Sequence, residues 1–453
     1  MRFTQFTLAL VFAVAEARTR RSSKNQPNAK LEKFMSWATV EGKDFTTHAE
    51  FNLRQKIWEE NDKIIEETNA KAGNSKDALR LKHNQFSAMS EDEKAKLLSL
   101  RAQEVKKASL SAKLNQRVKH HSDPSVPIDW YEDGKTGSIK DQGGCGSCYT
   151  FASNTVLEAT AMIEKGLPYK RLSEQQIVDC ANRWITNYEY DLWGCDGGYM
   201  TETWKYQKNN GMMLDADYGY TGYQAETCGE VESEKISDYS VADWSSTDHS
   251  GDFAGILDKL AHGPVAIAVS ASPSAFMFYE SGIVTSDTCS GQLDHAVVLV
   301  GYEPGIMEGV QSKGKGMRGR VSEQIVDVRC RQRRWRDHFY DSGCMHSDEM
   351  QDGDFCCYEV IYNTDDDFEP DDNTDPDDNT DPDDNTDPDD NTDPDDNTDP
   401  DDNTDPDYTE PAYWRVQNSW GVGWGDMGFI KFAVEGGSGA CGMNQWVDQV
   451  MVQ

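Results

Sequence analysis

A six-residue repeat strongly limits what this chain of 453 residues can fold into. The unit Asp-Asp-Asn-Thr-Asp-Pro occurs six times in succession over residues 371–406. Its aspartates repel one another, its proline stops a helix, and it offers no apolar side chain to bury. Residues 365–410 hold 24 of the 80 acidic residues and no basic one, so much of the net charge of −36 is local. We therefore expect an extended, disordered tract between two globular parts of the chain.

The first 17 residues have the pattern of a secretory signal peptide. Arg2 precedes an apolar run that ends in the small residues Ala15 and Ala17. This run is too short to cross a bilayer, and no later stretch approaches the roughly 20 apolar residues of a membrane-spanning helix. We expect a protein of the secretory pathway, delivered outside the cell or to a lysosome or vacuole. Its acidity disfavours binding to nucleic acid and to anionic membranes.

A thiol in a glycine-rich stretch, residues 142–151, is the most reactive feature of the sequence. Eleven cysteines in a secreted chain suggest several disulfides and one unpaired thiol, because an odd number cannot pair internally. Cys148 is the candidate for that thiol, because the pattern of residues 152–164 predicts a helix just after it. Unpaired amides and the helix dipole lower the pKa of a thiol at a helix N-terminus. Cys148 is thus a candidate nucleophile.

Residues 30–100 have a charged, helical pattern whose longest segment is 48–70. Six side chains of this segment recur every three or four positions and share one stripe: Glu50, Arg54, Trp58, Asn61, Ile65 and Asn69. Taken alone, the stripe indicates an amphipathic helix docked on a core. Ser90 and Glu93 have the spacing of a capping box, which predicts another helix. A change to His, Ser, Asp and Pro near 120–127 predicts a domain boundary.

The pattern from residue 126 to residue 302 is that of a globular domain. It predicts, in order, a short helix ending near Cys180, a tight loop at 194–198, and buried strands at 260–269 and 296–300. Another strand is predicted beyond the repeat, at 413–417. His295 begins the second buried strand, and a histidine in such a place is by itself usually structural.

Cys148 gives His295 a second interpretation. A cysteine nucleophile needs a base and a group that orients the base, commonly His and Asn from distant parts of the sequence. The chain supplies Cys148, His295 and Asn418 in that order, within the stretches 142–151, 293–297 and 418–425. With the 194–198 loop, these stretches resemble the papain family of cysteine proteases, most closely its cathepsin L-like branch.

The resemblance covers most of the chain except residues 303–412. It implies an α+β, papain-like fold of two domains with a peptide-binding cleft between them. A helical left domain would carry Cys148, and a β-barrel-like right domain would carry His295 and Asn418.

The resemblance also assigns roles to individual residues. Cys148 would be the nucleophile, and His295 its ion-pair partner and general acid and base. Asn418 would hold the imidazole through a hydrogen bond that Trp420 covers from water. Gln142 would donate its side-chain amide to the oxyanion, beside the backbone N–H of Cys148.

Disulfides, cofactors and substrate contacts follow in the same way. The resemblance implies the bridges Cys145–Cys195, Cys180–Cys228 and Cys289–Cys441, and it implies neither a cofactor nor a metal. The main specificity pocket would be apolar and would favour a hydrophobic P2 residue, the second residue before the scissile bond. The residues expected to bind substrate are Gly197, Gly198, Tyr199, Met200, Leu293, Asp294, Ala296, Trp420 and Trp446.

The proregion matches the inhibitory propeptide of the same family. The stripe from Glu50 to Asn69 fits its interspersed helix motif, with Trp58 in place of the usual Phe. A second motif keeps Asn84 and Phe86, but Lys82 and Ala88 replace the usual Gly and Asp, which bears on the acid-sensitive part of activation. The resemblance implies a signal peptide at 1–17, a propeptide at 18–125 and a catalytic domain at 126–453. Maturation would occur near 122–126.

Residues 303–412 would be an insertion in the catalytic domain, containing Cys330, Cys344, Cys356 and Cys357. These cysteines could form two further bridges or bind a metal. The insertion could be a solvated excursion, a weak calcium site on the aspartates, or a clasp between the acidic tract and the arginines of 329–336. Residues 331–334 also resemble a processing site for proteases that cleave after basic residues.

These observations predict a monomeric cysteine endopeptidase, made as a zymogen, that cleaves peptide and protein substrates and is inhibited by its own propeptide. A catalytically silent binding protein that acts through its acidic repeat is the alternative. The repeat alone would also fit an acidic matrix protein. The presence of Gln142, Cys148, His295 and Asn418 together argues against a silent protein.

Overall fold

The computed structural model describes residues 26–100, 123–305, 325–332, 355–362 and 411–453. The chain forms two compact units, one made of residues 1–308 and 407–453 and the other of residues 309–406. The signal peptide, Cys344 and the acidic repeat with its possible calcium site lie outside the described residues. None of the described helices is long and apolar enough to cross a membrane.

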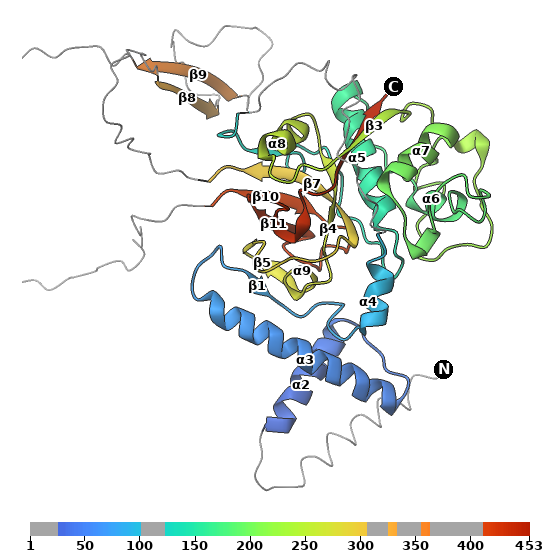
Figure 1. Ribbon diagram of the computed structural model, residues 1–453, viewed down its shortest axis with the longest axis vertical. Coiled ribbons are helices and arrows are strands. Elements are labelled where there is room, and N and C mark those ends of the chain that lie inside the picture. Colours follow the sequence, from blue (N-terminus) through green and yellow to red (C-terminus); the bar gives the residue numbers. More distant parts are fainter. Residues whose placement is uncertain (1–25, 101–122, 306–324, 333–354, 363–410) are drawn as a thin grey trace, which may run out of the picture. The chain divides into compact units, whose positions relative to one another are not determined.

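The N-terminal segment is helical, as its sequence pattern predicts (Figure 1). Helix α2 spans Gln26–Val40, α3 spans His48–Ala72 and α4 spans Glu91–Leu97. Thr47 caps α3 by accepting a hydrogen bond from the Glu50 backbone N–H. The Ser90 and Glu93 capping box is confirmed, because each side chain accepts from the other's backbone N–H. A two-stranded sheet that the pattern does not predict pairs β1 (Arg80–Leu81) with β5 (Tyr279–Ser281).

A group of helices carries the glycine-rich stretch that contains Cys148. Helix α5 spans Cys148–Lys165, and its side chains are buried from Cys148 to Ala161. Ser173 caps α6 (Glu174–Cys180), which ends where the sequence predicts. The 194–198 loop contains the 3₁₀ helix η2 (Gly194–Asp196), and α7 (Met200–Asn210) follows it. A second 3₁₀ helix, η3, spans Glu232–Glu234.

An eight-stranded sheet forms the second half of the domain, in the order β3-β12-β4-β7-β10-β11-β6, with β2 also paired to β7. Its central strands pair antiparallel, and His295 on β7 lies opposite Val269 on β4. The bounds of its strands are β2 Ile128–Asp129, β3 Val241–Thr247, β4 Val265–Val269, β6 Ile283–Val284, β7 His295–Glu303, β10 Tyr413–Gln417, β11 Phe429–Ala433 and β12 Val447–Val452. Helices α8 (Phe253–Ala261), α9 (Ser274–Met277) and η4 (Ala440–Gly442) complete this half.

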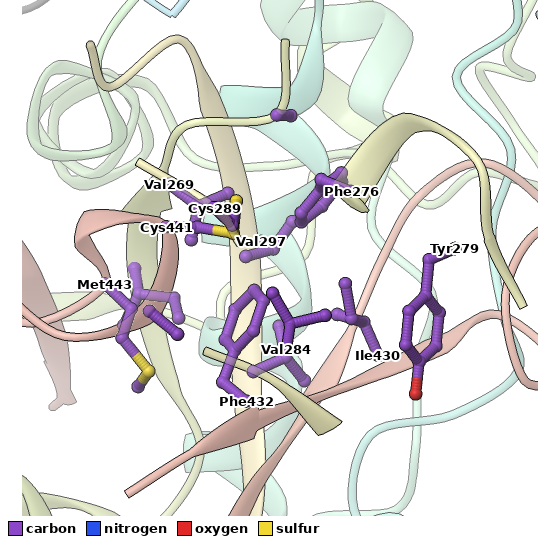
Figure 2. Packing of buried hydrophobic residues seen from close by; sticks show 14 of the residues in the cluster. Val269, Phe276, Tyr279, Val284, Cys289, Val297, Ile430, Phe432, Cys441 and Met443 are labelled. Atoms are coloured by element: carbon purple, nitrogen blue, oxygen red, sulfur yellow. A yellow bond between two sulfur atoms is a disulfide. The ribbon is translucent and has the colours of Figure 1, made fainter. Parts of the chain in front are cut away.

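The core of the sheet half is aliphatic and aromatic (Figure 2). Phe276, Phe432 and Val297 are buried there, next to the disulfide between Cys289 and Cys441. Burial of such side chains contributes roughly 25 cal/mol per Å² of apolar surface. A second buried cluster packs α5 against β7, through Ala152 and Val156 on the helix and Val298 on the strand. Strand β7 carries His295, and β10 leads to Asn418.

One sequence-based expectation needs correction. The strand predicted at 260–269 begins only at Val265, because Leu260 belongs to α8, whose N-terminus Asp252 caps. The short apolar run from 260 is compatible with either a helix or a strand, and the cap decides.

The insertion contains a hairpin that its glycine-rich, basic pattern does not predict. Strands β8 (Ile325–Gln332) and β9 (Phe355–Tyr362) pair antiparallel, with Cys330 opposite Cys357 and Arg331 opposite Cys356. The insertion leaves the main sheet at the end of β7 and returns to it at the start of β10. These two ends are neighbours in the sheet, since Glu303 pairs with Tyr413.

Candidate active site

Cys148 is the first residue of α5 and is fully buried. It is the only free cysteine among those whose side chains the structure describes, since the others form bridges. Burial raises the pKa of the Cys148 thiol to about 12. The backbone N–H groups of Ala296, Tyr149 and Cys148 itself oppose this rise, because they hydrogen-bond the sulfur and favour its anion. Ala296 directly follows His295, so the Cys148 sulfur lies at the start of β7.

His295 is oriented by Asn418. The Nε2 atom of His295 lies 2.8 Å from Oδ1 of Asn418, and this oxygen also accepts from the backbone N–H of Ser419. Because an amide oxygen only accepts, Nε2 carries the proton of the neutral ring and Nδ1 keeps a lone pair. Within the described residues Nδ1 has no hydrogen-bond partner. A neutral His295 can therefore accept a proton at Nδ1.

Trp420 covers this hydrogen bond, as the resemblance implies. Its ring stacks on that of His295, with centroids 4.7 Å apart and planes 29° apart, and it is buried. Burial lowers the pKa of His295 to about 4, against the hydrogen bond to Asn418, which raises it. The environment thus favours a neutral imidazole in this form of the protein.

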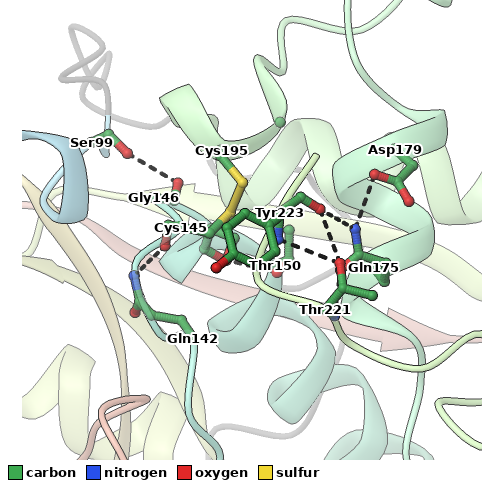
Figure 3. The surroundings of a disulfide bond; sticks show 12 residues. Ser99, Gln142, Cys145, Gly146, Thr150, Gln175, Asp179, Cys195, Thr221 and Tyr223 are labelled. Carbon is green, nitrogen blue, oxygen red and sulfur yellow. Dashed lines mark hydrogen bonds between the residues drawn. A yellow bond between two sulfur atoms is a disulfide. The ribbon is translucent and has the colours of Figure 1, made fainter. Parts of the chain in front are cut away.

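The side chain of Gln142 is held in one orientation. Its Oε1 accepts from the Ser419 hydroxyl at 2.7 Å, so its Nε2 faces the other way. That nitrogen donates to the carbonyl oxygen of Cys145 at 3.0 Å and has a longer contact of 3.5 Å with that of Leu97 (Figure 3). An amide donor so placed could stabilise an oxyanion. Sequence reasoning did not assign a role to Ser419, whose hydroxyl orients Gln142 and whose backbone N–H contacts Asn418.

The three disulfides implied by the resemblance are all formed in the structure: Cys145–Cys195, Cys180–Cys228 and Cys289–Cys441. The first ties the loop before Cys148 to η2 (Figure 3).

The structure also explains Tyr149, which follows Cys148. Its hydroxyl donates to the Gly194 carbonyl at 2.9 Å, and a Cβ on Gly198 would come within 2.9 Å of its ring. Tyr149 therefore packs behind Cys148 and braces the 194–198 loop.

The segment after α4 contacts residues on either side of Cys148. Leu100 donates its backbone N–H to the Asp294 carbonyl at 3.0 Å, and the Ser99 hydroxyl donates to the Gly146 carbonyl at 3.0 Å (Figure 3). A Cβ on Gly197 would come within 1.8 Å of the Ser99 carbonyl oxygen. Only glycine permits this approach. The propeptide therefore covers the residues on both sides of Cys148.

The residues expected to form the main pocket belong to one buried cluster. Tyr199, Met200, Ala296 and Trp446 are members together with Leu100, and Leu293 packs against them. The rings of Tyr199 and Trp446 are 6.2 Å apart, and Nε1 of Trp446 donates to Oδ1 of Asp448 at 2.9 Å. Asp294 does not face this cluster with its carboxylate, which accepts from Ala271 and Ser272.

The six-residue stripe of α3 faces the rest of the propeptide. Arg54 makes two hydrogen bonds to the carboxylate of Glu93, of 2.5 and 2.6 Å, and a third to the Ala88 carbonyl at 2.9 Å. Asn61 donates to Ser87, and Trp58 stacks on His83 at 4.1 Å. The remaining members act locally: Asn69 pairs with the backbone of Leu81, Ile65 is buried, and Glu50 accepts from Thr46.

The second propeptide motif contacts the catalytic domain. Asn84 donates to the Met277 carbonyl at 2.8 Å, and the rings of Phe86 and Trp420 lie 4.7 Å apart. Lys82, at a position where the family usually has Gly, reaches the Gly425 carbonyl at 3.4 Å. Ala88, which replaces the usual Asp, is buried and offers Arg54 only its backbone carbonyl. The carboxylate that pairs with Arg54 is therefore that of Glu93.

A buried ion cluster lies behind α5 and was missed in the sequence. Lys140 contacts Glu158 at 2.9 Å and Glu174 at 2.8 Å, and all three are buried. Burial disfavours a charged lysine, but the attraction of the two carboxylates outweighs this effect and raises the pKa of Lys140. No spacing signal links these residues, because they meet only through the fold.

Metal binding has no support in the described residues. Their one group of suitable ligands is Cys180, Cys228 and Glu230, and its two cysteines are bonded to each other.

Comparison with known families agrees with this geometry. Residues 125–309 and 399–451 match the model of the papain family cysteine protease, and residues 34–93 match that of the cathepsin propeptide inhibitor domain. Among curated relatives, a cathepsin L-like proteinase of Fasciola hepatica is 34% identical, over 59% of this chain and 78% of its own length. Digestive cysteine proteinase 2 of Homarus americanus is 30% identical, over 59% of this chain and 80% of its own length.

Solved structures show the same fold. Digestive procathepsin L 3 from the larval midgut of Tenebrio molitor superposes with a TM-score of 0.58 at 21% identity, covering 93% of this chain and 99% of its own. The recombinant precursor of stem bromelain gives a TM-score of 0.58 at 20% identity, over 94% of this chain and 99% of its own. Both are similar to this chain in its precursor form.

Proposed function

We propose that this chain, which belongs to the papain family of cysteine proteases, is an endopeptidase made as a zymogen and activated by loss of its propeptide. The observation that carries this proposal is the orientation of His295. Asn418 holds the Nε2 atom of His295 at 2.8 Å, which leaves a lone pair on Nδ1. The next residue along the chain, Ala296, contacts the Cys148 sulfur through its backbone N–H. This is the arrangement of a nucleophile, a base and a group that orients the base.

The mechanism follows from these positions. His295 takes the thiol proton at Nδ1, and the Cys148 thiolate attacks the carbonyl carbon of the scissile bond. The C=O electron pair moves to the oxygen, where the Gln142 amide and the Cys148 backbone N–H stabilise the charge. When this pair returns, the C–N bond breaks and His295 protonates the departing amine. Water, deprotonated by His295, then hydrolyses the thioester and releases the acid product and the thiol.

The proposed substrates are peptides and proteins with a hydrophobic P2 residue. The apolar cluster around Tyr199, Met200 and Trp446 supports this preference, since Leu100 of the propeptide belongs to the same cluster. We propose that Gly197 and Gly198 leave space for the substrate backbone, as Gly197 does for Ser99.

The remaining proposals concern the precursor. Residues 18–125 would be the removable propeptide and residues 126–453 the catalytic domain. The three disulfides fit folding in an oxidising compartment, which supports the secretory pathway with an extracellular, lysosomal or vacuolar destination. The protease is proposed to act as a monomer, and weak calcium binding by the acidic repeat is proposed from its oxygen ligands alone.

Covalent labelling tests the proposal. After propeptide removal, a mechanism-based epoxide inhibitor should label the wild-type enzyme at Cys148, and the label should be absent from Cys148→Ala. His295→Ala should abolish peptide cleavage while keeping the fold, as judged by circular dichroism. If the activated enzyme neither cleaves peptides nor takes the label, the chain is a silent binding protein and the proposal is wrong.

A further inference from the structure

The two groups proposed to stabilise the oxyanion lie at opposite ends of a glycine-rich loop. One is the side-chain amide of Gln142 and the other is the backbone N–H of Cys148, with Gly143, Gly144 and Gly146 between them. Glycine gives a chain its widest conformational freedom, so such a loop does not fix the distance between its own ends. The donors of an oxyanion site must nevertheless stand in place before the charge develops. Contacts from outside the loop therefore have to hold the two ends.

The hydroxyl of Tyr220 contacts both ends of this loop. It donates to the Gln142 carbonyl at 2.8 Å, and it lies 2.7 Å from Oγ of Ser147, the residue before Cys148. A phenol has a single proton, which Tyr220 gives to the first bond, so the Ser147 hydroxyl is the donor in the second. Gln142 and Ser147 are fully buried and Tyr220 is half-buried. Two hydrogen bonds thus join the ends of the loop through one side chain.

Other contacts of the loop act on different parts of it. The Cys145–Cys195 bridge and the hydrogen bond from Gly146 to the Cys195 carbonyl, at 2.9 Å, hold its middle. The Ser419 hydroxyl orients the side chain of Gln142. None of these contacts joins Gln142 to the residue before Cys148, and the Tyr220 hydroxyl does.

Tyr220 belongs to a segment that two helices hold in place. Gln175 of α6 accepts from the backbone N–H of Thr221 at 2.8 Å and donates to the Tyr223 carbonyl at 2.7 Å (Figure 3). The ring of Tyr220 packs edge-on against that of Phe151 in α5, with centroids 4.9 Å apart. A side chain fixed by packing and by hydrogen bonds around it can hold a neighbouring group precisely. The place of the Tyr220 hydroxyl is therefore set by α5 and α6.

We propose that Tyr220 is a positioning residue for the oxyanion site, whose hydroxyl sets the place of Gln142 relative to the Cys148 N–H. It acts through Gln142 and Ser147 and does not itself touch the reacting atoms. The inference rests on the proposed function, because it takes Gln142 and the Cys148 N–H as the donors to the oxyanion. Formation and hydrolysis of the thioester both pass through an oxyanion. Loss of the hydroxyl should therefore slow both steps and leave the binding of substrate unchanged.

The test compares two hydroxyl deletions in the activated enzyme. Tyr220→Phe removes the hydroxyl and keeps the ring against Phe151. Tyr223→Phe is the matched control, because it removes a hydroxyl from the same segment at a side chain that is 80% exposed. Titration with the epoxide inhibitor gives the concentration of active sites, so a loss of folded protein is not counted as a loss of rate. Alkylation of Cys148 by iodoacetamide forms no oxyanion and reports on the thiolate alone.

Tyr220→Phe should lower kcat and kcat/KM equally, by about 10-fold, which is less than the roughly 100- to 1000-fold cost of losing a direct oxyanion donor. KM and the alkylation rate should keep their wild-type values, and Tyr223→Phe should match the wild type in every measurement. In a Gln142→Ala background, Tyr220→Phe should have a smaller effect, because one of the groups through which it acts is gone.

Three results would overturn the inference while the wild-type enzyme is active. They are an unchanged kcat in Tyr220→Phe, a fall in the alkylation rate as large as the fall in kcat, and an undiminished effect in the Gln142→Ala background. A wild-type enzyme that neither cleaves peptides nor takes the epoxide label would instead overturn the proposed function, and this inference with it.

Discussion

Trp446 is the side chain that we propose to set the substrate preference at P2. It is buried against Tyr199 and fixed by Asp448, which accepts its Nε1–H at 2.9 Å. A bulky indole at this place should make the P2 pocket shallow. Burial raises the pKa of Asp448 to about 7, so the partner that fixes the indole is itself easily neutralised.

Trp446→Ala should improve cleavage of substrates with a large P2 residue such as Phe, relative to those with a small one such as Val. We expect a change in selectivity of at least about 10-fold, the lower end of what one methylene group contributes in an apolar pocket. Profiling kcat/KM across a peptide library varied at P2 measures it. Asp448→Asn is the control, because it keeps an acceptor for the indole and should leave selectivity unchanged. An identical P2 profile in Trp446→Ala would show that the indole does not limit the pocket.

At the same scale, sequence reasoning named the residues that we propose to react and missed residues that hold parts of the site in place. Cys148, His295 and Asn418 follow from residue type and order, because the chemistry requires them. Ser419, which orients Gln142, and Lys140, which pairs with two buried glutamates, carry no such signature. Their partners lie far away in the sequence, so only the folded chain shows that they meet.

At the scale of elements, helix α4 links the two helical motifs of the propeptide. Glu93 completes the capping box with Ser90 and also holds Arg54 of α3 through two hydrogen bonds. The local role was predictable from spacing, because a cap spans three residues. The pairing with Arg54 was not, since it depends on how α3 and α4 pack.

Glu93→Gln should loosen the propeptide and speed conversion of the zymogen. The Arg54 guanidinium, together with Ser90, lowers the pKa of Glu93 from 4.5 to about 2. A carboxylate whose pKa is lowered by folding stabilises the folded state at pH values above its unfolded-state pKa, here 4.5. This stabilisation is lost as the pH falls from 4.5 towards 2. Because the Arg54–Glu93 pair is partly exposed, we expect it to contribute about 1 kcal/mol to the free energy of unfolding at pH 7.

The zymogen's melting temperature, followed against pH, measures this effect. The wild type should melt higher than Glu93→Gln at pH 7, and the two should converge in strong acid. Glu91→Gln is the matched control, because Glu91 pairs with Lys94 on the surface of the same helix and should contribute little. Equal melting temperatures for wild type and Glu93→Gln at pH 7 would contradict the role given to the pair.

The elements that the sequence misplaced share a physical cause. Apolar runs such as that from Leu260 fit a buried helix or a buried strand, and flanking residues such as the cap Asp252 decide between them. Strand β1 has only two residues, and it exists because β5 offers it a partner. Neither choice is made by local propensity.

At the scale of the whole molecule, the propeptide and the catalytic domain together set the state of the catalytic pair. Ser99 and Leu100 contact Gly146 and Asp294, which lie close in sequence to Cys148 and His295, and both members of the pair are fully buried. Burial raises the pKa of Cys148 to about 12 and lowers that of His295 to about 4. The thiol is neutral below its pKa and the imidazole is neutral above its own, so both are uncharged at pH 7. We therefore expect the propeptide to block access to the catalytic pair and also to disfavour the thiolate.

Removal of the propeptide should reverse this state. Water then reaches the cleft, the cost of charging falls, and the amides of Cys148, Tyr149 and Ala296 favour the thiolate next to a protonated His295. Ultraviolet absorbance of the thiolate at pH 7 should be absent from the zymogen and present in the activated enzyme. Cys148→Ser, processed by an added protease, gives the baseline for both forms. The alkylation rate of Cys148 should rise by at least ~100-fold on activation. Thiolate absorbance of equal size in the zymogen would mean that the propeptide acts by steric exclusion alone.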